Sequence, residues 1–394
     1  MRKSVEAPPG DQTASAANAA QPVRKPEPAL PSGSPSRQSR LFPGRFSLAG
    51  LLHVVALLAI VYVVWGWAND RLWPSSWSSP TGYGGDADYT MGCLRAASEF
   101  DLIPFLSRTV FRLGAPYTAN WNDFPQSESL LIFLLGLVAR WSNLGAAATF
   151  GVILGHLTSA LSFYLCCRLL RFRREWAVAG ALLWAFTYYH TARGLGHLAI
   201  AYDYTVPLAL VGCWLLTASP RIRLGGRFFW LCLGAGLVIG MSNPYNLNMW
   251  AQFVCLGMGL RFLVHRRKAD LAVGALVLAA SAAGFLTVNI NTFCYQALHG
   301  ANQLAVARDY HQLELFGLKP LELILPPTNH RVEFLGDLSR EYATTALIRG
   351  ELFFPYLGVV AIGALIWMAA ELSLRMLNLR KQPRRFSLHV PQCL

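Results

Sequence analysis

The chain has 394 residues, of which 54% are hydrophobic and only 14% are charged, and its formal net charge is +13. A soluble domain carries about a quarter charged residues, so this composition excludes an ordinary soluble protein. The basic residues lie in short clusters between apolar runs, as the positive-inside rule produces in membrane proteins, and this placement argues against a nucleic-acid partner. The sequence predicts an all-α polytopic membrane protein.

Residues 1–45 differ from the rest of the chain. They are rich in Ala, Pro and Ser, contain few large apolar residues and carry scattered Arg and Lys. Such a segment cannot bury enough apolar surface to offset its ordering entropy, so we expect a disordered tail. No apolar h-region and small-residue cleavage site close it, and the apolar segment that follows is therefore expected to be a retained anchor.

About eight apolar runs have the length and composition of membrane spans. The basic clusters between them, such as "RLLRFRRE" at 168–175 and "HRRK" at 265–268, fall on one side in alternation. The positive-inside rule then predicts cytoplasmic termini, including a basic tail at 372–394. Two long loops, 69–145 and 292–351, are left on the extracytoplasmic side. The predicted spans are 46–68, 146–167, 176–190, 199–217, 228–242, 249–264, 270–291 and 352–371.

Two shorter elements are predicted within the long loops. "SLLIFLLGLVARW" at 129–141 is apolar but too short for a span, which favours a re-entrant or interfacial helix on the outer side. "LKPLELILPP" is expected to form a short amphipathic helix that Pro326 and Pro327 end. We find no internal repeat of the kind that marks many transporters.

The stretch "GGDADYTM" at 84–91 follows the first span closely. On an extended segment, residues two apart point the same way, so Asp86 and Asp88 are expected to converge on one cation or one substrate. A carboxylate at the edge of a low-dielectric region has its pKa raised and can act as a general base for a hydroxyl. The alternative is a turn with solvated acids. A second polar stretch, "NWNDFPQSE", carries Asp123.

Three histidines are candidates for polar chemistry. His156 lies in the middle of a predicted span, where an ionisable residue suggests a functional site, although a neutral histidine that bridges helices is commoner. His190 and His197 flank the turn "HTARGLGH", and Asp203 follows. Their spacing matches no strong metal motif, and we favour the polar lining of a substrate groove.

The second long loop and one short turn offer further polar groups. Arg308, His330 and Arg331 lie in the loop, and an arginine there can hold a phosphate through two parallel hydrogen bonds. An ordinary solvated loop is the alternative. The turn "SNPYNLN" contains Asn243 and Tyr245, which suit sugar hydroxyls but can equally cap two helices.

These features together resemble the C-type (GT-C) integral-membrane glycosyltransferases over roughly residues 46–371. "GGDADYT" looks like the DxDY motif of membrane mannosyltransferases, and "GLGHLAIAYDYTVPLAL" at 194–210 is similar to a "GH…PL" stretch of bacterial members. The helix at 129–141 falls where that family has juxtamembrane helices. The resemblance implies one span, then a large outer loop with an acidic motif, then further spans.

By that resemblance the enzyme transfers a sugar from a polyprenyl-phosphate donor to a hydroxyl of a glycan, lipid or protein acceptor. The reaction takes place at the extracytoplasmic face of a bacterial inner membrane. Asp88 becomes the preferred candidate for the catalytic base, with Asp86 beside it, and both are candidate ligands of a divalent cation such as Mg²⁺ or Mn²⁺. The candidate substrate-binding residues are Tyr89, Asp123, His197, Asn243, Tyr245, Arg308, His330 and Arg331.

Two other classes of function are compatible with the sequence. A transporter or flippase of lipid-linked sugars or polysaccharide is also polytopic, but it should line its spans with polar residues and show repeats. A non-catalytic membrane assembly subunit needs no aspartates in its loops. Because intramembrane ionisable residues are few and the acids gather in the loops, the sequence favours the transferase.

Overall fold

The computed structural model describes residues 48–381 except 107, 115, 124–127, 219–223, 301, 304–309, 311, 313–316 and 348–354, with 218 and 378–381 as backbone only. The predicted tail at 1–45 lies outside the described residues. Regular structure in the described chain is helical except for one small antiparallel ribbon, β1 (Thr109–Val110) and β2 (Ala119–Asn120). The predicted all-α class is confirmed for this part of the chain.

Five helices among the described residues are long and apolar enough to span a membrane. At 1.5 Å per residue, even the 21 residues of α1 cover the ~30 Å hydrocarbon core. Each of the five overlaps a predicted span, and α11 runs beyond the predicted end at residue 291. They are α1 (Leu48–Ala68), α4 (Leu144–Leu169), α10 (Pro244–His265), α11 (Lys268–His299) and α14 (Gly358–Lys381).

The other three predicted spans contain shorter helices, so the layout with eight full-length spans is not confirmed. These helices are α5 (Arg174–Ala185), α8 (Thr205–Ala218) and α9 (Arg227–Met241), with 12, 14 and 15 residues. All three lie within or close to the predicted ranges. The positions of the apolar runs were therefore predicted better than the lengths of the helices.

The predicted spans 176–190 and 199–217 are interrupted, which the sequence analysis did not anticipate. Between α5 and α8 the chain forms two short helices, α6 (Tyr188–Arg193) and α7 (Leu198–Ala201). Pro207 lies in the first turn of α8, where its missing N–H costs no hydrogen bond, so a helix begins there instead of continuing from residue 199. Irregular backbone at membrane depth is tolerated where protein surrounds it or where it lines a cavity.

The first long loop folds against the membrane helices. It contains η2 (Pro74–Ser78), α2 (Asp86–Ser98) and α3 (Ser129–Trp141). α3 has the bounds predicted for the short apolar helix. It packs closely on α2, since a Cβ on Gly136 would lie 2.5 Å from the Cβ of Ala97. The core beneath this loop contains Leu94, Leu135 and Ile153, which are almost fully buried.

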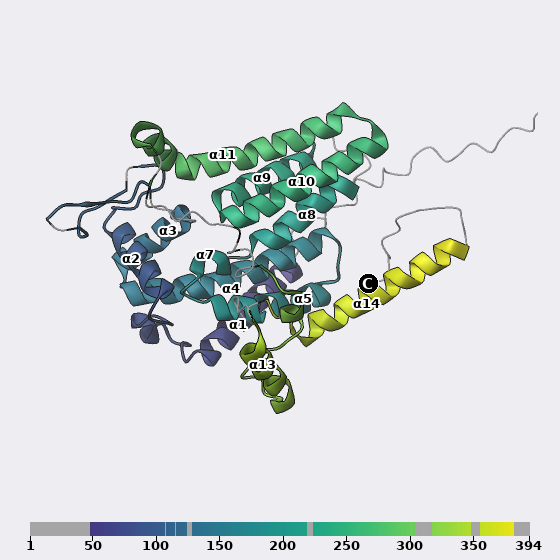
Figure 1. Ribbon diagram of the computed structural model, residues 1–394, viewed down its shortest axis with the longest axis horizontal. Helices are drawn as coiled ribbons and strands as arrows, with labels where there is room; N and C mark the ends of the chain where they lie inside the picture. The colour runs from purple at the N-terminus through teal and green to yellow at the C-terminus, as the bar shows by residue number, and fades with distance from the viewer. Residues whose placement is uncertain are drawn as a thin grey trace, which may run out of the picture. The chain divides into compact units, whose positions relative to one another are not determined.

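Helices α8 to α11 form a second packed region with its own apolar core around Trp250 and Ile239. α11 lies along α9 and α10 (Figure 1). The backbones of α9 and α11 approach closely through small residues, because a Cβ on Gly236 would lie 2.7 Å from Ser281 Oγ. Such small-residue contacts are typical of helix pairs in membranes.

The second long loop differs from its prediction. The amphipathic helix predicted for "LKPLELILPP" is only one 3-10 turn, η3 (Pro320–Leu323). The helix α13 (Glu333–Thr345) follows it. The backbone N–H of Leu357 donates to Leu323 O at 3.1 Å and ties η3 to the start of α14. α14 continues through residue 381, so the part of the predicted basic tail at 372–381 is helical, and residues 382–394 lie outside the described residues.

Candidate functional site

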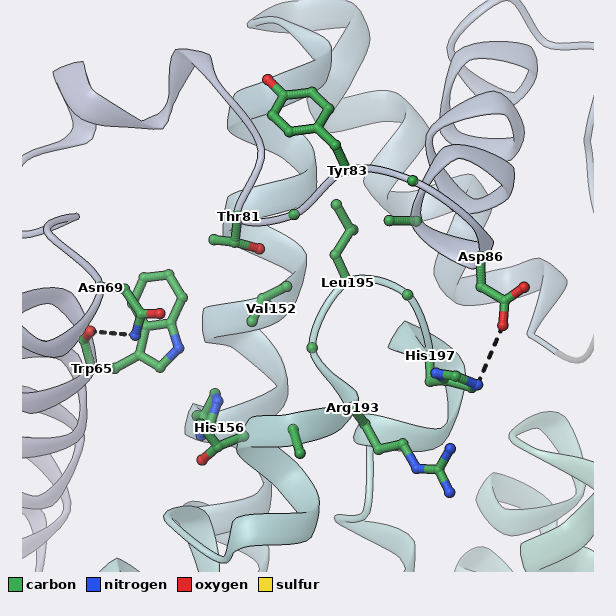
Figure 2. A pocket seen from close by; sticks show the side chains of 17 residues that line it. Trp65, Asn69, Thr81, Tyr83, Asp86, Val152, His156, Arg193, Leu195 and His197 are labelled. Carbon is green, nitrogen blue, oxygen red and sulfur yellow. Dashed lines mark hydrogen bonds and ion pairs between the residues drawn. The ribbon is translucent and has the colours of Figure 1, made fainter. Parts of the chain in front are cut away.

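A pocket of about 420 Å³ lies where the end of α1, the segment 81–87, α4 and the turn 191–197 meet (Figure 2). Its volume is within the roughly 300–1,000 Å³ typical of small-molecule sites. Its lining is mostly polar. The polar and ionisable side chains that line it include Asn69, Thr81, Asp86, His156, Arg193 and His197.

Local contacts fix the walls of this pocket. Thr149 of α4 donates from Oγ1 to Ser79 O at 3.2 Å and holds the segment before residue 81 on α4. Gly194 adopts a positive φ of 43° and turns the chain after α6. Gly196 then lies against the start of α2, since a Cβ there would be 3.7 Å from Ala87 N. The next residue, His197, is thereby brought to α2.

The aspartate motif is helical, and the expectation of an extended segment is wrong. Gly84 and Gly85 both have positive φ values, 86° and 56°, and the turn they form starts α2 at Asp86. Acidic residues in a first turn are favoured by the helix dipole. Because successive residues on a helix are about 100° apart, Asp86 and Asp88 point in different directions and do not converge on one ligand.

The two aspartates have different partners. Asp86 Oδ2 lies 3.3 Å from His197 Nε2, and the two side chains are 66% and 35% exposed. Figure 2 shows them pointing toward one another at one side of the pocket. Asp88 Oδ1 instead accepts a hydrogen bond from the N–H of Gly84 at 3.1 Å, which closes the turn before α2. Only Asp86 lines the pocket.

Two buried histidines lie together at the pocket, and one of them, His156, lines it. His156 Nδ1 donates to Ala185 O at 2.7 Å, at the point where α5 ends. Its ring centroid is 4.0 Å from that of His190, and His190 Nδ1 is 3.3 Å from Asp203 Oδ1. The interruption of the predicted spans therefore brings these three ionisable residues together. Among the described residues, no group of three or more His, Cys, Asp or Glu is arranged to hold a metal ion.

Tyr89 and Asp123 both lie away from the pocket lining. Tyr89 is one turn after Asp86 on α2, and burial raises the pKa of its hydroxyl above the ordinary value of 10.0. Asp123 Oδ1 accepts a hydrogen bond from Gln296 Nε2 at 2.5 Å. This contact joins the first loop to the end of α11.

The described pocket lining also lacks four further predicted substrate-binding residues, Asn243, Tyr245, His330 and Arg331. Asn243 is 1% exposed and caps α10, because its Oδ1 accepts from the N–H of Tyr245 at 2.8 Å. The Tyr245 side chain is exposed. His330 Nδ1 accepts from the N–H of Val332 at 3.1 Å, and Arg331 is exposed in the second loop. Arg308 lies outside the described residues.

Three charged residues of interest were not selected from the sequence as site candidates. Arg193 lines the pocket and is 8% exposed; an arginine between two histidines in "HTARGLGH" was a usable signal. Glu128 is 5% exposed, and burial raises the pKa of its carboxyl well above the ordinary value. Arg108 is 2% exposed. No sequence pattern distinguishes the last two from solvated loop charges.

No protein-family model, curated protein sequence or solved structure matches this chain.

Proposed function

We propose that the protein transfers a sugar from a polyprenyl-phosphate-linked donor to an acceptor hydroxyl at the extracytoplasmic face of the membrane, as C-type glycosyltransferases do. One observation carries the proposal. An Asp–His pair stands at the side of a small-molecule-sized pocket that lies between a loop and membrane-length helices. A donor with a lipid tail and a sugar head requires a site at such a boundary.

In this proposal Asp86 is the general base. The acceptor oxygen attacks the anomeric carbon, and its proton passes to the Asp86 carboxylate. The bond between the anomeric carbon and the phosphate oxygen breaks, and its electron pair leaves with the polyprenyl phosphate. His197, 3.3 Å from Asp86, orients the carboxylate, as hydrogen-bonded partners commonly do for a catalytic base.

Asp86 replaces Asp88 as the preferred base because it alone of the two lines the pocket. Asp88 already accepts a backbone hydrogen bond within its own turn. The two residues occupy the same first turn of α2 and are exposed. They therefore form a matched pair for substitution.

The test is transfer from a panel of labelled polyprenyl-phosphate sugars by purified, reconstituted protein. We expect Asp86→Asn to lower turnover by about 10²–10⁴-fold, the range typical of losing a general base, and Asp88→Asn to remain close to wild type. The opposite pattern would show that the base is Asp88. If the wild-type protein transfers no sugar from any donor in the panel, the proposed activity is wrong.

One observation favours a second function, proton-coupled transport of a lipid-linked sugar. His156, His190 and Asp203 form a buried ionisable cluster that reaches the pocket at His156, and such clusters serve as proton relays in transporters. Proteoliposomes separate the two functions. A transporter moves labelled lipid-linked sugar in response to a pH gradient and loses this movement in His190→Gln, whereas a transferase changes the acceptor chemically without a gradient.

A further inference from the structure

Arg108 occupies a fixed position in the first loop, directly before β1. Its backbone N–H donates to Asn122 Oδ1 at 2.8 Å, and its carbonyl accepts from the N–H of Trp121 at 2.8 Å. The residue is 2% exposed. These contacts fix the backbone, and the surrounding protein encloses the side chain.

The guanidinium of Arg108 is buried without a counter-charge. Its Nε and Nη2 atoms have no hydrogen-bond partner among the described residues, and no described carboxylate pairs with it. The ionisable groups that act on it are Tyr89 and Cys93 of α2, both neutral at pH 7. Burial lowers the pKa of Arg108 from its ordinary value of 12.5, but an arginine in a protein stays charged at neutral pH.

Burying a guanidinium without a counter-charge costs free energy of folding unless an anion binds to it. Taking a charged side chain out of water costs several kcal/mol after relaxation, and buried N–H groups without acceptors add to that cost. A guanidinium is planar and offers parallel N–H donors, which match two oxygens of a phosphate. Unpaired, buried donors of this kind indicate a ligand position better than exposed loop arginines do.

Arg108 also lies next to the face of α2 that begins at the pocket. Asp86, Tyr89 and Cys93 are three and four residues apart and share one face of that helix. Tyr89 is close enough to both Arg108 and Asp86 for their charges to act on its pKa. Burial raises the pKa of Tyr89, so its hydroxyl stays protonated. The hydroxyl is hydrogen-bonded with Cys93, and a phosphate oxygen that accepts its hydrogen bond would replace that weak thiol partner.

We propose that Arg108, with the hydroxyl of Tyr89, forms an anion site that binds a phosphate group beside the pocket. The site takes a phosphate monoester or diester, either from a prenyl lipid or from a free phosphate. That the phosphate belongs to the sugar donor rests on the proposed function; the existence of the anion site does not. The site replaces Arg308 and Arg331, which the sequence suggested for this role.

The experiment measures binding without turnover. Purified full-length protein in a phosphate-free detergent is titrated with inorganic phosphate in one arm and with a short-chain polyprenyl monophosphate in the other. The thermal midpoint of wild type should rise with the concentration of the bound phosphate. Arg108→Met should weaken the affinity for that phosphate by about 10–100-fold, which corresponds to the free energy of the charge-assisted hydrogen bonds that are lost.

A structural role for Arg108 predicts a different result. If the charge only holds the fold together, Arg108→Met should be less stable than wild type without ligand. If the charge of Arg108 serves to bind an anion, Arg108→Met without ligand should be as stable as wild type or more stable. The reason is that an apolar side chain removes an uncompensated buried charge. Arg112→Met is the matched control: it lies in the same loop, is exposed and pairs with Glu99, and should keep the wild-type response.

The outcomes decide the proposal as follows. A response to the prenyl phosphate alone identifies a lipid source, and a response to inorganic phosphate as well identifies the phosphate group itself. No response of wild type to either probe, or an equal response of Arg108→Met, contradicts the site. Should Arg108→Met fail to fold, Arg108→Lys decides, since a lysine cannot bind bidentately: weakened binding supports the site and unchanged binding contradicts it. Phosphate binding without sugar transfer would leave the site standing and overturn only the proposed function.

Discussion

Two arginines of this protein are buried to nearly the same extent but have different surroundings. Arg261, in α10, is 4% exposed, and Arg108, in the first loop, is 2% exposed. Arg261 Nε lies 3.0 Å from Asp270 Oδ2 of α11, and its Nη1 donates to Leu216 O and Thr217 O at 3.1 and 3.3 Å. Arg108 has no such carboxylate or carbonyl partners among the described residues.

The difference in partners distinguishes a buried charge that stabilises the fold from a buried charge that is available to bind a ligand. Arg261 joins the end of α8, the end of α10 and the start of α11, and protein groups supply its counter-charge and acceptors. In the region of α2 and the first loop, Arg108 and Glu128 are buried with polar atoms that lack partners, and Asp86 and His197 are partly open to the pocket. We expect substitutions around Arg261, in α8, α10 and α11, to change stability. Substitutions in the region of α2 and the first loop should change binding and activity.

The largest effect on stability is expected from Arg261→Met. This change leaves Asp270, 4% exposed, as a buried carboxylate without its partner, which should cost about 3–5 kcal/mol. The measurement is the unfolding midpoint in detergent, compared at equal protein concentration. Sugar transfer per folded molecule should stay close to wild type.

The double variant Arg261→Met with Asp270→Leu is the control for this prediction. Removing both charges of a buried pair is often neutral or stabilising, so the double variant should recover most of the lost midpoint. A double variant as unstable as the single one would show that packing of the arginine, and not its charge, holds the three helices.

A smaller effect of opposite sign is expected from Glu128→Gln in the region of α2 and the first loop. Burial raises the pKa of Glu128 above its ordinary value of 4.5, so the folded protein keeps this proton over a pH range in which the unfolded chain has lost it. Stability therefore falls as pH rises from the ordinary value toward the raised one. Glutamine carries no charge, so the variant should be more stable than wild type at neutral pH.

The pH dependence gives the check on Glu128. The midpoint difference between Glu128→Gln and wild type should vanish below the ordinary pKa of the carboxyl, where wild type is neutral in both states. Glu333→Gln, at the exposed start of α13, should retain the wild-type pH profile. A difference that persists unchanged at low pH would assign the effect to side-chain shape instead of charge.

The long helices could be predicted because a run of apolar residues near the bilayer length has few alternatives in a membrane. The interruption between α5 and α8 was predicted only as the polar turn 191–198; its extension to residue 186 on one side and residue 204 on the other was not, because apolar and aromatic side chains continue there. Its local signals, Gly194 and Pro207, each occur in continuous membrane helices as well. The wrong reading of "GGDADYTM" has a similar cause: a glycine pair before two acids fits both a turn and a helix start.

Parts of the candidate site could be named in advance, but not their pairing. Asp86 and His197 were each selected from sequence, and their contact depends on how the turn after α6 packs against α2. Arg108 was not selected at all. Its backbone is held by Trp121 and Asn122, directly after the ribbon of β1 and β2. Two pairs of residues form this ribbon, and no sequence period predicts it.

The smallest effect is expected from substitution of Asn243. This substitution tests whether a polar residue that the sequence suggested for sugar binding instead stabilises the helices α8 to α11. Its Oδ1 caps α10, and its Nδ2 donates to Ala199 O at 3.5 Å. Asn243→Ala should lower stability by about 1 kcal/mol, the usual value of a lost N-cap, with the Michaelis constant for the acceptor unchanged. Asn243→Ser keeps a capping oxygen and should restore most of the midpoint. Tyr245→Phe removes an exposed hydroxyl two residues away and should stay within about 0.5 kcal/mol of wild type. An acceptor Michaelis constant that rises in Asn243→Ala while the midpoint stays fixed would return Asn243 to the substrate site and extend that site to the start of α10.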